Sequence, residues 1–94
     1  MERDKFISAI GYDGDSAIID KIRFSKNKGK SLSELIKEGA FRSAAAYAVY
    51  TGSDPDMHAV VEAYNSLSNS NYKKEQLQRL FGVSKAEVKK AVLL

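Results

Sequence analysis

The sequence predicts an all-α fold, a compact bundle of five or six short helices in a single domain of 94 residues. Three features lead to this prediction. Helix-capping patterns recur along the chain, glycines stand where helices are expected to end, and apolar residues follow helical spacing. The expected helices lie near residues 15–26, 32–38, 40–51, 55–67, 72–81 and 85–93.

The first part of the chain is where β structure is a serious option. Residues 5–12 can form either a short strand or a helical turn, and the sequence leaves both open. Asp13-Gly14-Asp15 resembles the start of a calcium loop, but the later EF-hand positions carry no suitable ligands. A turn, with Asp15 as the N-cap of the helix at 15–26, explains these residues instead.

The next helices have clear starting signals. Ser31 and Glu34 have the spacing of a capping box, in which the serine oxygen accepts from a free helix N–H and the glutamate reaches back. The alanine-rich helix at 40–51 is apolar on every side, which is typical of a buried central helix. Asp54 followed by proline begins the helix at 55–67. The apolar stripe of that last helix comprises Met57, Val60, Val61, Tyr64 and Leu67.

The predicted domain has three parts. Residues 1–67 form the helical body, residues 68–71 (Ser-Asn-Ser-Asn) a short linker, and residues 72–94 a pair of helices. In that pair, Leu77, Leu80 and Phe81 form the apolar face of the first helix, and Gly82 makes a tight turn. A second capping box, Ser84 to Glu87, begins the second helix, which turns Val88, Ala91 and Val92 back onto the first.

Residues 73–92 resemble the helix-turn-helix of bacterial DNA-binding proteins, in which a Leu-x-x-x-Phe-Gly-Val-Ser string ahead of an amphipathic helix is common. The resemblance implies that Lys85–Leu94 is a recognition helix whose N-terminus and lysines contact phosphates. The nucleic-acid-binding residues that it implies are Ser84, Lys85, Ala86, Lys89, Lys90 and, on the first helix, Arg79. This implies a non-enzymatic protein that binds DNA or RNA.

The charge distribution has two interpretations, and on charge alone solvated helix faces are favoured over a phosphate-binding face. The net charge is +3, but residues 20–30 carry five basic residues against one acidic, and residues 71–94 carry six against two. If both segments fold onto one face, that face attracts phosphate. Base reading usually needs Arg, Asn or Gln, whereas the predicted recognition face offers Lys and Ala. We therefore expect weak, poorly specific binding, with log K falling against log salt at a slope near −4 to −5.

Several function classes find no support in the composition. Without cysteine there is no disulfide, thiolate nucleophile or cysteine-ligated zinc, and His58 is the only histidine. No cluster of acid, base and nucleophile is visible, so we expect neither an enzyme nor a metal or cofactor site. No apolar run approaches the length of a membrane span and no signal peptide is visible, so we expect a cytoplasmic protein without a membrane partner.

A helical adaptor that binds another protein through an apolar groove is the alternative. Gly39-Ala40-Phe41, with the two helices that follow, is similar to part of a tetratricopeptide-type helical hairpin. Only one such unit is visible, whereas stacked repeats normally need three or more.

Overall fold

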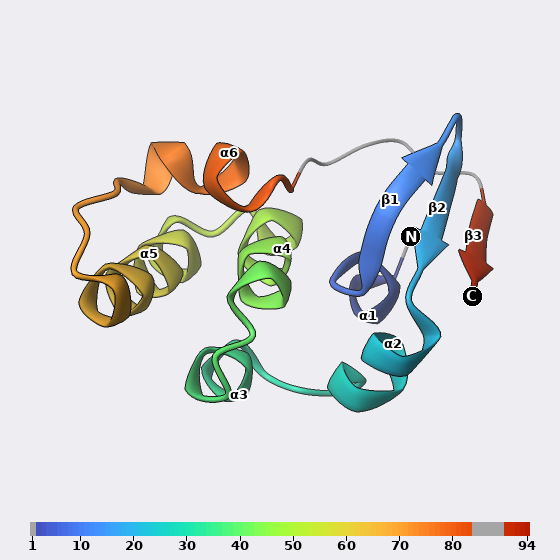
Figure 1. Ribbon diagram of the computed structural model, residues 1–94, viewed down its shortest axis with the longest axis horizontal. Helices are drawn as coiled ribbons and strands as arrows, with labels where there is room; N and C mark the ends of the chain where they lie inside the picture. The colour runs from blue at the N-terminus through green and yellow to red at the C-terminus, as the bar shows by residue number, and fades with distance from the viewer. Residues whose placement is uncertain (1, 84–89) are drawn as a thin grey trace.

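The computed structural model describes residues 2–83 and 90–94, and it shows an α+β protein rather than an all-α bundle (Figure 1). The prediction of an all-α fold is therefore wrong, because two of the predicted helical regions contain strands. The described elements are α1 (Arg3–Phe6), β1 (Ala9–Asp13), β2 (Ser16–Ile19), α2 (Lys21–Asn27), α3 (Leu32–Lys37), α4 (Phe41–Thr51), α5 (Asp54–Ser68), the 3-10 turn η1 (Lys74–Gln76), α6 (Leu77–Phe81) and β3 (Lys90–Leu93).

The molecule is elongated, about 36 × 24 × 20 Å, and its two kinds of structure are segregated along its length. Helices α3 to α6 occupy one half, and the sheet with α1 and α2 occupies the other (Figure 1). The three strands follow the order β1-β2-β3, with β2 antiparallel to β1 and parallel to β3. No helix in the part of the chain that the structure describes is long and apolar enough to span a bilayer.

The predicted helix at 15–26 is instead a strand followed by a shorter helix. Residues 16–19 (Ser-Ala-Ile-Ile) bury every second side chain, which is the two-residue period of a strand. Asp20 then caps α2, because its carboxylate accepts from the Ile22 and Arg23 N–H groups at 3.0 and 3.1 Å. Asp15 lies in the β1–β2 turn and is not a helix cap. The ambiguous residues 5–12 contain both alternatives, the end of α1 and the start of β1.

The C-terminal segment also differs from the prediction. Lys90–Leu93 forms β3, so a second helix that continues to residue 93 is wrong. Ala91 pairs with Ala17 of β2 and does not face α6. The strand is fastened at its end, since the Leu94 N–H donates to the Ile19 oxygen and the Lys21 N–H to the Leu94 oxygen, both at 3.0 Å. The predicted capping box from Ser84 to Glu87 lies outside the described residues.

The middle of the chain confirms the local helix signals. The Ser31–Glu34 capping box is present, α4 is buried along most of its length, and α5 begins beside the proline. The cap of α5 is Ser53 rather than Asp54. Residues 72–81 form η1 and α6 instead of one continuous helix, and Gly82 adopts the expected left-handed conformation with φ 64°.

Two apolar cores stabilise the two halves. The larger surrounds α4, where a run of one serine and three alanines, Ser43 to Ala46, lets neighbouring helices approach closely. The smaller lies beneath the sheet, where Ala9, Ala17 and Ile19 contact Phe24 of α2. Since Phe24 turns inward, the other side of α2 faces solvent, and Ile22 and Lys26 are exposed.

Candidate nucleic-acid interface

The predicted site residues do not come together in the described part of the structure. Arg79 is exposed on α6 and Lys90 is exposed at the start of β3, and these two elements belong to opposite halves of the molecule (Figure 1). The other four predicted residues lie outside the described ranges: Ser84, Lys85, Ala86 and Lys89.

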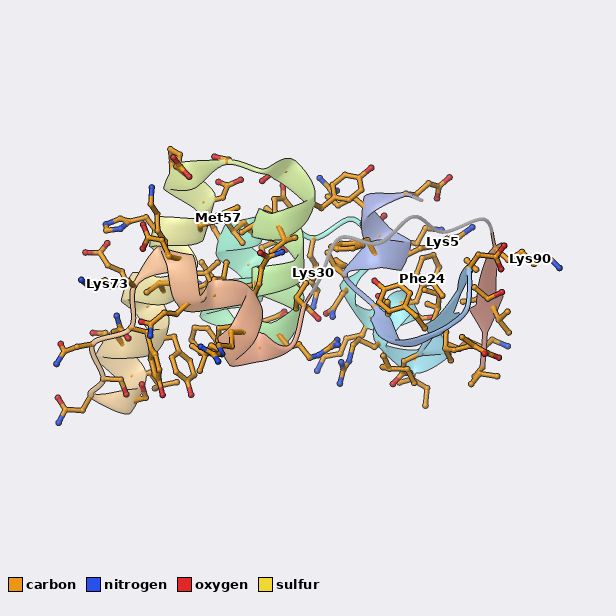
Figure 2. The ribbon with its side chains drawn as sticks, turned by 90° about the horizontal axis from the view of Figure 1, so that it is seen from above. Lys5, Phe24, Lys30, Met57, Lys73 and Lys90 are labelled. Carbon is orange, nitrogen blue, oxygen red and sulfur yellow. The ribbon has the colours of Figure 1, made fainter. Side chains whose placement is uncertain are left out.

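The described lysines of the second basic segment are spread along the molecule. Lys73 and Lys90, both from the second segment, lie at opposite ends of the long axis, and Lys30 of the first lies between them (Figure 2). Lys74 is moreover paired with Asp54, with 3.2 Å between Nζ and Oδ2. The described part of the second segment is therefore dispersed, and these lysines do not meet the condition of a single basic face.

The first basic segment, in contrast, remains concentrated on α2 and the turn that follows it. No acidic residue occurs between Lys21 and Ser33. Among the described residues, Lys30 is the only cation of this segment in an ion pair, with Glu38 at 2.7 Å. The remaining cations, which we call the α2 cations, comprise three exposed lysines and one half-buried arginine: Lys21, Lys26, Lys28 and Arg23.

A pocket of about 460 Å³ lies beside the α2 cations, between α2 and the start of α4. We call it the α2–α4 pocket. Its charged lining residues are Arg23, Lys26, Arg42 and Asp20. Asp20 is already occupied as the cap of α2, so three cations oppose one engaged carboxylate. The electrostatic environment of this pocket therefore favours an anion.

The α4 side of the pocket is held in place by two contacts. Arg42 donates from Nη1 to the Ala9 oxygen of β1 at 2.7 Å, which anchors the start of α4 to the sheet. Its charge also reaches Tyr12: burial raises the pKa of this phenol, and the Arg42 guanidinium partly offsets that rise. The second contact is a buried hydrogen bond from Asn27 Nδ2 to Ser43 Oγ, 3.3 Å long, which connects α2 to α4.

Sequence reasoning placed the interface at the C-terminus and missed Arg42, Asn27 and Ser43. These residues are brought together by the packing of α2 against the start of α4, two helices that α3 separates in the sequence. The sequence nevertheless contained one local sign that the start of α4 has no side-chain cap. Residue 40, directly before the central helix, is alanine, whereas capping residues precede α2, α3 and α5.

No group of three or more His, Cys, Asp or Glu side chains that could hold a metal ion occurs within residues 2–83 and 90–94. No family model, curated protein or solved structure matches this chain. The candidate interface therefore depends on its own geometry and charge.

Proposed function

We propose that this protein is a small non-enzymatic nucleic-acid-binding protein that contacts backbone phosphates through the α2 cations. The observation that carries the proposal is the concentration of four cations on α2 and at its C-cap, without an ion pair among the described residues. Such cations are available to replace the counterions condensed on nucleic acid, which supplies most of sequence-independent affinity.

The proposed mode of binding, contact with backbone phosphates, is the one expected from the sequence, but the main contact surface is now on α2. Lys and Arg on an exposed helix position a protein on phosphates without reading bases, so the binding is weak and salt-sensitive. The helix-turn-helix lysines Lys85 and Lys89 stay predicted contributors, as does Arg79 on the exposed side of α6. The proposed compartment is the cytoplasm, in keeping with a chain free of cysteine.

Fluorescence anisotropy with labelled 16-nucleotide DNA and RNA, single-stranded and duplex, tests the proposal. Titrations at several salt concentrations give the slope of log K against log salt. Four phosphate contacts predict a slope of about −3 to −4 on duplex DNA. No detectable binding at low salt would exclude the function.

Three charge-reversal variants then locate the surface. Lys26→Glu with Lys28→Glu removes half of the α2 cations, and Lys37→Glu with Lys73→Glu makes the same change in net charge at exposed positions elsewhere. Lys89→Glu with Lys90→Glu tests the C-terminal lysines. We expect the variant at Lys26 and Lys28 to lose at least tenfold in affinity, and the variant at Lys37 and Lys73 clearly less. Circular dichroism is expected to show unchanged helicity in both. Equal losses in all three would indicate an effect of net charge alone, and a loss confined to the third would return the interface to the C-terminus.

A protein-binding adaptor is the second candidate, and one surface feature favours it. A pocket of about 440 Å³ lies between α3 and α5, lined in part by Ile36, Phe41 and Leu67. Leu67 is 73% exposed, although it belongs to the predicted apolar stripe of α5. Leu67→Glu is expected to leave nucleic-acid binding unchanged in the anisotropy titrations. If a protein co-purifies with the wild-type chain but not with this variant, the adaptor function is supported.

A further inference from the structure

The start of α4 is an unusual helix end. Its N-cap, Ala40, provides no side-chain hydrogen bond, and the first helical bond joins the Ala44 N–H to the Ala40 oxygen. The N–H groups of residues 41–43 therefore precede the helical ladder and have no partner from it. An 11-residue helix also carries partial positive charge at this end, which attracts anions.

Asn27 supplies a second and independent observation. Its side chain lines the same pocket, the residue is only 4% exposed, and its Oδ1 has no hydrogen-bond partner among the described residues. A buried polar atom without a partner is costly, but the oxygens of an ionised phosphate accept and cannot satisfy Oδ1 in this orientation of the amide. Rotating the amide by 180° lets the Ser43 hydroxyl donate to Oδ1 and presents Nδ2 to the pocket as a donor.

We propose that the α2–α4 pocket binds a phosphate group, held by the free N–H groups at the start of α4, the Asn27 amide and the cations Arg23, Lys26 and Arg42. Guanidinium groups suit this role because their planar donors match phosphate oxygens in pairs. Arg42 is prepositioned by its bond to the Ala9 oxygen, so less side-chain freedom is lost when the anion binds.

The pocket is larger than a phosphate group and falls within the range of small-molecule sites. Its apolar lining includes Phe41 and Ile22, and Ile22 is 81% exposed. A nucleoside attached to the phosphate can contact these side chains. The phosphate can come from a nucleic-acid backbone, from a chain end or from a free nucleotide, and only the first two sources rest on the function proposed above.

Titrations followed by ¹H–¹⁵N NMR test this site directly. The probes are inorganic phosphate, adenosine 5′-monophosphate, and one eight-nucleotide DNA carrying either a 5′-phosphate or a 5′-hydroxyl, all at constant ionic strength set with chloride. We expect saturable shifts of the backbone amides of Phe41, Arg42 and Ser43 and of the Asn27 side-chain amide. If phosphate and every other probe leave these four signals unmoved, the site is excluded, whether or not the DNA binds elsewhere.

The probes also separate the sources of the phosphate. Tighter binding of the 5′-phosphorylated DNA at these signals indicates a chain end, and equal binding of both DNAs indicates a backbone phosphate. Shifts with phosphate and the mononucleotide, but not with DNA, support the pocket while removing its link to nucleic acid. In that case failure of the proposed function is distinguished from failure of the pocket.

A matched pair of variants on α2 distinguishes a built pocket from general surface charge. Arg23→Gln removes a lining cation, and Lys28→Gln removes a cation of the same helix region that does not line the pocket. We expect Arg23→Gln to weaken phosphate binding about five- to tenfold and Lys28→Gln less than twofold. Equal weakening by both would overturn the proposal.

Discussion

Asn27 and Ser43 form a buried hydrogen bond, with 3.3 Å between Nδ2 and Oγ, that connects the sheet half of the molecule to its helical half. Both side chains also line the α2–α4 pocket. The same contact therefore fixes how α2 lies against α4 and shapes the proposed anion site.

Removing this hydrogen bond is expected to destabilise the fold. Ser43→Ala leaves the Asn27 amide without its partner in a buried place, which costs about 1–3 kcal/mol of unfolding free energy. Urea denaturation measures this as a lower midpoint with an unchanged m-value. Ser33→Ala, an exposed serine on α3, is the control and is expected to change stability by less than about 0.5 kcal/mol. A Ser43→Ala protein as stable as the control would contradict the structural role.

Replacing a buried and an exposed leucine by alanine is expected to change the unfolding free energy by very different amounts. Leu77 of α6 is 1% exposed in the main core, whereas Leu67 of α5 is 73% exposed. Leu77→Ala removes buried apolar surface and leaves a cavity, for an expected loss of about 2–5 kcal/mol. Leu67→Ala is expected to lose less than about 0.5 kcal/mol in the same denaturation experiment. Similar losses for the two variants would show that Leu77 is not buried in the main core.

Stability is expected to fall at high pH because of Tyr12. Tyr12 is 38% exposed, and the partial burial of its phenol raises the pKa above its ordinary value of 10.0, so folding favours the neutral form. Its contribution is fully present below pH 10.0 and is lost as the pH rises through the raised value. Tyr12→Phe is expected to reduce this loss in denaturation curves measured at several alkaline pH values.

The Arg42 charge provides the reciprocal test. Because the guanidinium lowers the pKa of Tyr12, Arg42→Gln is expected to raise that pKa further. The ring ¹³C shift of Tyr12, followed through an alkaline NMR titration, measures the change. A pKa that falls in the variant would show that Arg42 is not close to this ring.

The strand at the C-terminus predicts a specific pattern of hydrogen exchange. The Leu94 amide is bonded to Ile19, so it exchanges slowly, and the ¹³C shifts of residues 90–93 are those of a strand. Ala17→Asp places a charge in the sheet core, where Ala17 is 0% exposed, and is expected to speed exchange at Leu94. The Gly52 amide, bonded to Ala48 at the end of α4, is the internal reference and should change less. Helical shifts at residues 90–93 would contradict β3.

The successes of sequence reasoning lie where the signal is local. A capping box at Ser31 and Glu34 and an unbroken run of apolar residues in α4 depend on neighbours within one or two helical turns, and both predictions were confirmed. The glycine corner at Gly82 is local for the same reason, since a left-handed conformation favours a residue without Cβ.

The failures lie where a distant partner decides the structure. Residues 16–19 and 90–93 contain alanine and apolar residues that suit either a helix or a buried strand, and periodicity over so few residues does not separate the two. Residues 16–19 form a strand because β1 and β3 supply hydrogen-bond partners on its two sides, and residues 90–93 because β2 does, in the register from Ser16 with Lys90 to Ile19 with Leu93.

The sequence by itself determined the central helices, the Ser31 cap of α3 and the clustering of cations at residues 20–30, because capping, helical periodicity and charge are properties of neighbouring residues. Only the tertiary structure decided that Lys73 and Lys90 lie far apart (Figure 2), that β3 completes a sheet, and that Arg23 and Arg42 line one pocket. These arrangements depend on contacts between residues distant in the chain, whose free energy no local pattern of residues contains.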